Sequence, residues 1–193
     1  EEGVVYETLN LARLWDLPVI FVCENNTPGA VVKSAGGNNS SNLPEGRVIA
    51  TPRALGIESH EVDGGDAYAV DALFHDCVER CRHSGEPIFI EALTERWPGN
   101  YYSFPDMVTG KTDIARAWDE GAIGGDHEAW FRDYDPVLRL ARTMIAAGAA
   151  TADELASMDS QATAIIDAAR EFAINSPPPG TQTVHAHVLA GAV

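Results

Sequence analysis

The chain has 193 residues, 45% of them hydrophobic, which is enough for one compact domain with a sizeable core. Its 29 acidic residues outnumber 13 basic ones, for a formal net charge of −16. This charge argues against binding to nucleic acid or to an anionic membrane surface, both of which need a basic face. No apolar run approaches the roughly 18 residues that span a bilayer. The three cysteines make no disulfide framework, so we expect a reducing, cytoplasmic location.

The first part of the chain predicts alternating helices and strands. Residues 4–15, VVYETLNLARLW, are apolar around most of a helix, which is typical of a buried helix. Residues 18–23 form a β-branched and aromatic run that suits a strand covered on both faces. Residues 27–46 are rich in Gly, Asn, Ser and Pro and predict a long loop, of a length that is usually functional or disordered. A short helix over 48–55 and a strand over 58–62, ESHEV, follow.

A second helix and strand come next. The spacing of apolar residues between Val70 and Cys81 predicts an amphipathic helix that begins near Asp66. The segment PIFIEALTE, residues 87–95, predicts another strand. An order in which helices and strands alternate predicts an α/β fold with a mainly parallel sheet and helices on both faces.

The C-terminal part has a different character. Residues 98–134 predict a long connection, and residues 135–175 predict two C-terminal helices, over Asp135–Ala147 and Ala152–Ile174. A capping box of Thr151 and a glutamate three residues later marks the start of the second helix. We see no separate second domain, and therefore expect residues 1–193 to form a single, partial domain.

Polar residues follow the first predicted strand. Glu24, Asn25 and Asn26 stand between residue 23 and the long loop. Ligands of open parallel sheets bind beyond the carboxyl ends of the strands, and a neutral amide oxygen suits a magnesium ion that also bridges phosphate oxygens. On its own, an Asn pair more often ends a strand because Asn suits turns.

The sequence around this pair carries a family resemblance. The segment EEGVVYETLNLARLWDLPVIFVCENN resembles the α-type subunit of the thiamine-diphosphate-dependent decarboxylating component of pyruvate, branched-chain 2-oxo acid and acetoin dehydrogenases. The resemblance continues through residues 54–96, DYDPVLRL and FAINSPPP, and covers most of residues 1–180 in order. It implies a thiamine-diphosphate-binding fold. The family's cofactor motif runs from Gly-Asp-Gly to Asn-Asn, and its spacing places the Gly-Asp-Gly upstream of Glu1.

The resemblance assigns roles to four residues. Asn26 matches the second Asn of the motif, whose side-chain oxygen binds magnesium, and Pro28 matches a position whose backbone carbonyl is also a magnesium ligand. Arg96 and Asn100, in ERWPGNY, match a cofactor-binding loop that reads roughly Tyr-Arg-x-x-Gly-His-Ser. Asn100 replaces the histidine, which contacts the diphosphate and acts when the lipoyl arm is acylated. Asn100 can donate a hydrogen bond to phosphate at this cofactor-binding and catalytic position, but it cannot carry a proton near neutral pH.

A second cluster, HDCVERCRH at residues 75–83, has the residue types of a zinc site. On a helix, Cys77 and Cys81 share one face, whereas His75 and His83 point elsewhere. The four side chains therefore cannot converge on one tetrahedral ion. We interpret both cysteines as core residues.

The resemblance implies an enzyme that uses thiamine diphosphate and magnesium. In this family a β-type subunit supplies the glutamate that contacts the cofactor, so we expect activity only in an α2β2-type heterotetramer. The first hypothesis is oxidative decarboxylation of a 2-oxo acid, with acyl transfer to a lipoyl group or a carrier protein. An alternative is transketolase-like transfer of a two-carbon unit from a ketose to a carrier-bound acceptor, which Asn100 and the aromatic loop around it favour. A third hypothesis is a non-catalytic structural subunit.

Overall fold

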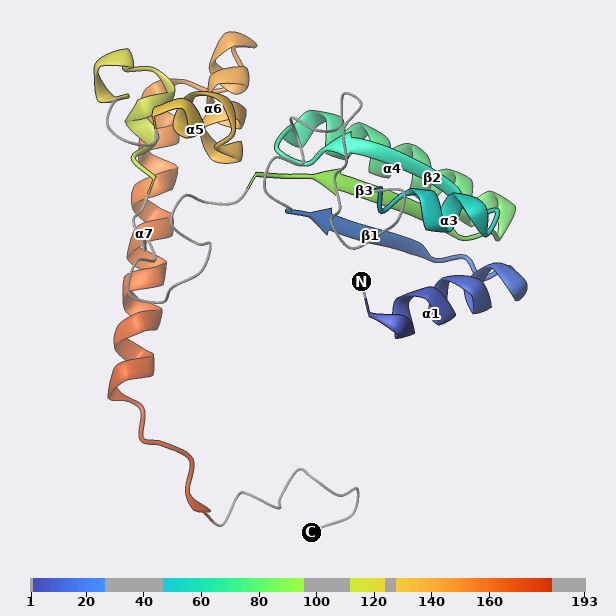
Figure 1. Ribbon diagram of the computed structural model, residues 1–193. Coiled ribbons are helices and arrows are strands. Elements are labelled where there is room, and N and C mark those ends of the chain that lie inside the picture. Colours follow the sequence, from blue (N-terminus) through green and yellow to red (C-terminus); the bar gives the residue numbers. More distant parts are fainter. Residues whose placement is uncertain (1, 27–46, 96–111, 124–127, 182–193) are drawn as a thin grey trace. The chain divides into compact units, whose positions relative to one another are not determined.

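The computed structural model describes residues 2–26, 47–95, 112–123 and 128–181 (Figure 1). The chain divides into two compact units, residues 1–151 and residues 152–193. The first unit contains a three-stranded sheet with the strand order β1-β3-β2. The strands are β1 (Ile20–Asn25), β2 (Glu58–Asp63) and β3 (Ile88–Leu93). Both strand pairs are parallel, and the predicted α/β class is confirmed.

Helices alternate with these strands, as the sequence predicts. Among the described residues, the alternating part contains the helices α1 (Gly3–Leu14), α3 (Ala50–Ala54) and α4 (Ala67–Ser84). The C-terminal part contains the 3₁₀ helices η2 (Ile114–Ala117) and η3 (Glu120–Ala122), and the α-helices α5 (Glu128–Asp133), α6 (Pro136–Ala146) and α7 (Ala152–Asn175). The helices and strands predicted from the sequence are all present, with ends displaced by a few residues. The predicted loop over 27–46 lies outside the described residues.

The sheet is covered on its two faces by different helices. On one face, Leu9 of α1 packs with Phe89 of β3 and with Ile49 and Ile57, which flank α3. On the other face, Cys77 and Cys81 of α4 pack against Ile88 and Ile90 of β3. Because neighbouring residues of a strand point to opposite faces, β3 contributes to both clusters. The fold therefore has helices on both faces of a parallel sheet.

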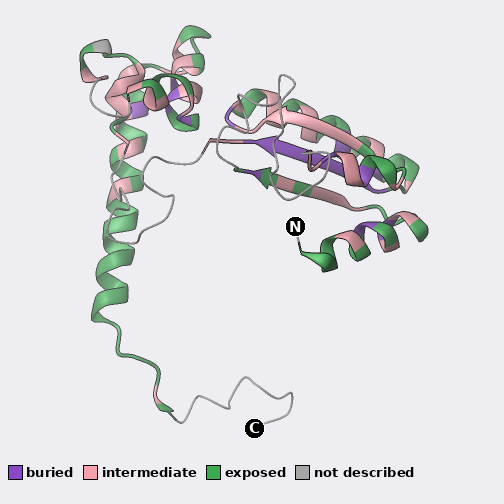
Figure 2. Cartoon of the chain, viewed as in Figure 1, coloured by how far each residue is buried: buried purple, intermediate pink, exposed green. Residues whose placement is uncertain are grey.

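Two expectations about burial are wrong. The sequence predicts a buried helix α1, but most of the helix is exposed or intermediate (Figure 2). Of its residues only Leu9 and Ala12 are buried, and the adjoining Trp15 is 62% exposed. The sequence also predicts that strand β1 is covered on both faces, but Val22 is 47% exposed. The reason is position: β1 is an edge strand of the described sheet, and α1 packs on the sheet with one side only. Strand β3, in the middle, is buried at every residue.

Helix α7 belongs to the second unit and is largely exposed. Five of its apolar side chains are between 58% and 77% exposed: Met158, Ile165, Ile166, Phe172 and Ile174. None of the helices in the described ranges is both long and apolar enough to cross a membrane. The assignment of the whole chain to one domain stays a prediction.

The start of α6 is fixed by a buried aspartate. Asp135 is 1% exposed, and its Oδ1 accepts hydrogen bonds from the backbone N–H groups of Val137 (2.9 Å) and Leu138 (3.1 Å). The Thr112 hydroxyl donates to Asp135 Oδ2 at 2.8 Å. Asp135 is therefore an N-cap that also ties the segment before η2 to α6.

We expect Asp135→Ala to lower the free energy of unfolding by about 1–3 kcal/mol, because it removes an N-cap and leaves buried donors without a partner. Urea unfolding of the full-length subunit followed by circular dichroism would measure the change. Asp133→Ala, at an exposed aspartate two residues earlier, is the control and should change stability by less than about 0.5 kcal/mol. Equal effects of the two substitutions would contradict the capping role.

Candidate functional site

The carboxyl ends of the three strands meet at one edge of the sheet. Asn25, Leu93 and Asp63 are the last residues of β1, β3 and β2 and are register partners across the sheet. The hydrogen bonding continues past the strands: Thr94 N–H donates to the Asn25 carbonyl at 2.9 Å, and Gly64 N–H donates to the Leu93 carbonyl at 2.8 Å. The three strand ends are thus held side by side, where parallel sheets bind their ligands.

A glycine allows the ends of β2 and β3 to approach closely. A Cβ atom on Gly64 would lie 2.6 Å from Thr94 Cγ2 and 3.1 Å from the Leu93 carbonyl oxygen. The first distance is shorter than real Cβ contacts and the second is tight, so any larger residue at position 64 would force Thr94 and the strand ends to shift.

A buried carboxylate lies in β3, close to the carboxyl ends of the strands. Glu91 of β3 is 0% exposed and Asn25 is 4% exposed. The Asn25 Nδ2 donates to Glu91 Oε1 at 2.7 Å, and the Ile49 N–H donates to Glu91 Oε2 at 3.0 Å. Burial raises the pKa of Glu91, and the hydrogen bonds from Asn25 and Ile49 offset only part of that rise.

A second carboxylate lies beside the first one in the sheet. Glu61 of β2 is the register partner of Glu91, and its Oε2 is 2.8 Å from Arg47 Nη2. The charge of Glu61 adds to the rise in the pKa of Glu91, whereas the Arg47 guanidinium lowers it. Arg47 and Ile49 both lie just after residues 27–46. The carboxylates of Glu61 and Glu91 therefore hold the chain from residue 47 onward against the face of the sheet on which α3 lies.

The end of β2 is tied to α6 by an ion pair. Arg139 Nη1 and Nη2 contact Asp63 Oδ1 and Oδ2 at 3.1 and 2.7 Å, and Gly65 N–H also donates to Asp63 Oδ1. Burial alone would raise the pKa of Asp63, but the hydrogen bonds from Arg139 and Gly65 outweigh it and hold the pKa below its usual value. This two-point contact fixes the orientation of the guanidinium.

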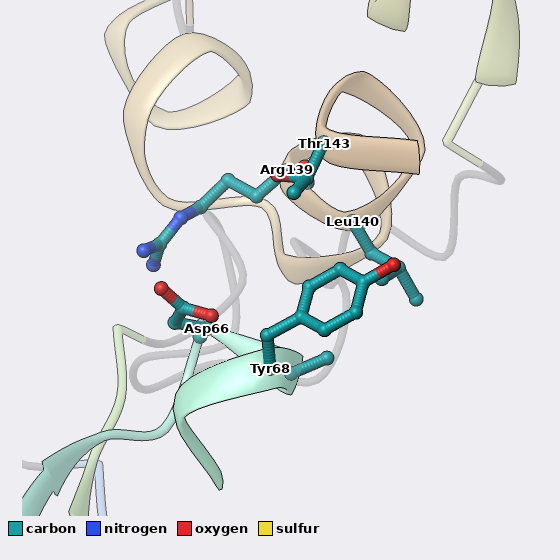
Figure 3. Close-up of a pocket in the computed structure, with 7 residues that line it drawn as sticks. Asp66, Tyr68, Arg139, Leu140 and Thr143 are labelled. Carbon is teal, nitrogen blue, oxygen red and sulfur yellow. Dashed lines mark hydrogen bonds between the residues drawn. The ribbon is translucent and has the colours of Figure 1, made fainter. Parts of the chain in front are cut away.

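A pocket adjoins this ion pair. It is lined by residues at the start of α4 and by one side of α6: Gly65, Asp66, Ala67, Tyr68, Arg139, Leu140 and Thr143. Figure 3 shows the Arg139 guanidinium pointing toward the Asp66 carboxylate, with the Tyr68 ring beside Leu140. Because Arg139 is already paired with Asp63, we place the candidate site at the strand ends rather than in this pocket.

The structure locates one of the four predicted site residues. Asn26 is exposed and directly follows β1 at the carboxyl edge of the sheet. Pro28, Arg96 and Asn100 lie outside the described residues. Within the described ranges, no group of three or more His, Cys, Asp and Glu residues is arranged to hold a metal ion. Magnesium binding by Asn26 and Pro28, and cofactor binding by Arg96 and Asn100, stay predictions.

The interpretation of the cysteines as core residues is confirmed. Cys77 and Cys81 are buried against the sheet, whereas His75 and His83 are exposed. Burial raises the pKa of the Cys77 thiol, which opposes the thiolate form that a zinc ligand needs.

Glu91 is a site residue that the sequence analysis missed. The signal was present, because a single glutamate interrupts the otherwise apolar run IFIEAL. A charged residue in a strand that is buried on both faces needs polar partners inside the fold. Its partners, Asn25 and Ile49, are 66 and 42 residues away in the chain, so no local pattern pointed to them.

The fold and the polar strand ends define a class of protein. It is an α/β protein whose parallel sheet has helices on both faces and polar side chains at the carboxyl ends of its strands. The chain belongs to the dehydrogenase E1 component family, whose model matches residues 1–182.

Curated relatives agree with this family. The chain is 31% identical over 189 residues to the pyruvate dehydrogenase E1 component subunit alpha of Rhizobium meliloti, and 32% identical over 188 residues to the protein of the same name from Porphyra purpurea. Each alignment covers 97% of this chain and 49% of the relative. A mitochondrial subunit alpha from Dictyostelium discoideum is 29% identical, with 97% of this chain and 45% of the relative covered. The chain thus spans about half the length of the relatives it matches. The cytoplasmic location expected from the sequence stays a prediction.

Proposed function

We propose that this chain is part of the α-type subunit of a thiamine-diphosphate-dependent 2-oxo acid dehydrogenase, which decarboxylates a 2-oxo acid and passes the acyl group to a lipoyl group or a carrier protein. The observation that carries the proposal is the match of residues 1–182 to the dehydrogenase E1 component family. The names of these relatives, which are all pyruvate dehydrogenase subunits alpha, favour this reaction over ketol transfer and over a purely structural role.

The chemistry at the end of β1 fits a magnesium ion. Asn26 is exposed at the carboxyl edge of a parallel sheet and offers a neutral amide oxygen. Magnesium prefers oxygen ligands and is often held by one or two protein groups together with substrate phosphates and water. A site with few protein carboxylates is therefore consistent with an ion that bridges a diphosphate. Asn26 and the carbonyl of Pro28 would hold the metal.

Thiamine diphosphate, when bound, supplies the nucleophilic carbon and the ring that accepts electrons as a carbon–carbon bond breaks. The part of the work that falls to this chain is to anchor the diphosphate. Arg96 would contribute a guanidinium that suits phosphate oxygens, and Asn100 an amide donor. Since an amide cannot exchange protons near neutral pH, Asn100 would orient the diphosphate at its catalytic position without acting as an acid or base.

A partner subunit is part of the proposal. An α-type subunit would meet a β-type subunit in an α2β2-type heterotetramer, with the cofactor between them. The apolar side chains exposed along α7, from Met158 to Ile174, support an interface on that helix. Large exposed apolar surfaces on a protein commonly mark contacts with other proteins.

The experiment compares substrates on the full-length subunit, alone and assembled with its β-type partner. With thiamine diphosphate and magnesium, the assembly should release carbon dioxide from a 2-oxo acid such as pyruvate, and the adduct trapped by acid quenching should derive from pyruvate. Turnover of a ketose phosphate in place of pyruvate would overturn the proposed reaction. Turnover of pyruvate by the subunit alone would overturn the requirement for a partner.

A further inference from the structure

We propose that Glu91 is a positioning residue that joins the two ends of the segment between Asn25 and Ile49 and so sets the placement of Asn26, the magnesium-binding residue at its start. This inference rests on the proposed function, because the segment begins with Asn26.

The geometry places one carboxylate between two distant parts of the chain. Asn25 directly precedes Asn26, and its side chain donates to Glu91 Oε1 at 2.7 Å. Ile49 lies beyond the far end of the segment, and its N–H donates to Glu91 Oε2 at 3.0 Å. Each oxygen of the carboxylate accepts from one end, so a change at Glu91 acts on both ends together.

A carboxylate is the side chain that suits this position. The Asn25 amide and the Ile49 N–H both donate to it, and a carboxylate offers two acceptor oxygens. A glutamine would present one acceptor and one donor, so either one hydrogen bond breaks or the Asn25 amide must turn around. An apolar residue would leave both donors buried without these partners, at the cost of their desolvation.

The same carboxylate is costly to the fold. Glu91 is fully buried, and transfer of a charged group from water to a protein interior is unfavourable unless partners compensate for it. The Arg47 guanidinium, which lowers the pKa of Glu91, makes its ion pair with Glu61. Positions where a fold keeps a local feature that costs stability are commonly those that serve function.

The test uses the full-length subunit assembled with its β-type partner, and it has two readouts. The first is the magnesium concentration that gives half-maximal binding of thiamine diphosphate, followed by the quenching of tryptophan fluorescence. The second is the rate of tryptic cleavage after Lys33, the lysine of residues 27–46, in the absence of cofactor. The second readout does not depend on the proposed function.

We expect Glu91→Gln to raise the half-maximal magnesium concentration by about tenfold or more, because partners that orient a metal ligand typically affect affinity by about 10–100-fold. Cleavage after Lys33 should become about tenfold faster, since a lost hydrogen bond to a charged group favours local opening by about that factor.

A conservative double variant tests whether the hydrogen bonds themselves matter. Asn25→Asp combined with Glu91→Gln restores a matched pair, in which the glutamine amide donates to the new aspartate carboxylate and its carbonyl oxygen accepts from the Ile49 N–H. The double variant should return both values to within about threefold of the parent protein, because each of these groups again has a partner.

Glu79→Gln is the control, because Glu79 is an exposed glutamate on α4 that pairs with Arg82 of the same helix; it should leave both values unchanged. A Glu91→Gln protein with the parent's magnesium dependence and cleavage rate would overturn the inference. So would a double variant that folds, binds its partner and shows no recovery. If the parent protein itself fails to bind the cofactor with magnesium, the proposed function is wrong, and the cleavage rates alone decide whether Glu91 joins the two ends.

Discussion

Asn26→Ala is expected to weaken magnesium-dependent binding of thiamine diphosphate to the full-length, assembled protein by more than about 100-fold. The side chain lies at the carboxyl end of β1, and alanine there has no oxygen to offer a cation. Loss of a partner that merely orients a ligand already costs about 10–100-fold in metal affinity, so loss of a direct ligand should cost at least the upper value. Titration of magnesium at a fixed cofactor concentration, followed by calorimetry, would measure the change.

Two further variants make this result specific. Asn10→Ala replaces another exposed asparagine, on α1, and should leave binding unchanged. Asn26→Asp keeps an oxygen at the same place and adds a charge that a hard cation accepts, so it should retain binding far better than Asn26→Ala. Unchanged binding in Asn26→Ala would show that the assignment of Asn26 to the metal is wrong, without touching the assignment of the family.

Ile90→Ala should lower the free energy of unfolding by about 2–5 kcal/mol. Ile90 lies in the central strand, is 0% exposed and packs against Cys77 and Cys81 of α4. Its removal would leave a cavity on the α4 side of the sheet. Urea unfolding of the full-length subunit, with the midpoint and slope both compared, would measure it.

The control for this substitution is at the same register position in the neighbouring strand. Val22 of β1 is the register partner of Ile90 but is 47% exposed. Val22→Ala should therefore cost less than about 1 kcal/mol, since little apolar area is removed from contact. A loss as large as that of Ile90→Ala would contradict the exposure of Val22 and would show that this face of β1 is covered in the full-length subunit.

Much of the fold was predictable because the signals were local. A β-branched run bounded by proline predicted β1, the i, i+3, i+4, i+7 spacing predicted α4, and Asp135 before a proline marked the start of α6. In each case the residues that form the element also carry its signal, so their spacing suffices. The Asp66 side chain, which accepts a hydrogen bond from Ala69 N–H, is a further cap that fits the predicted helix start.

Local patterns did not predict which sides of each helix and strand are packed against other parts of the protein. An apolar helix and an apolar strand indicate that apolar surface needs a neighbour, but not which neighbour lies on which side. In the described structure α1 contacts the sheet through Leu9, and β1 is an edge strand, so side chains such as Val22 and Trp15 are exposed. The strand order places β3, and not β1, at the centre.

The residues of the site also differ in whether they could be predicted from the sequence. Asn26 could be named from the resemblance, because its motif is a continuous stretch of sequence that ends at the strand. The partners of Glu91 could not, because they come from two other parts of the chain. The same holds for the Asp63–Arg139 ion pair, whose residues are 76 positions apart.

The strand order has a consequence for the way the chain folds as it is made. β1 and β2 are synthesised first, yet neither pairs with the other in the described sheet: each pairs with β3, which comes last. Until residue 88 has left the ribosome, these two strands have no central strand to receive their hydrogen bonds. Because pairings between distant segments form slowly, the pairing of these described strands with one another waits for β3 to insert between the first two.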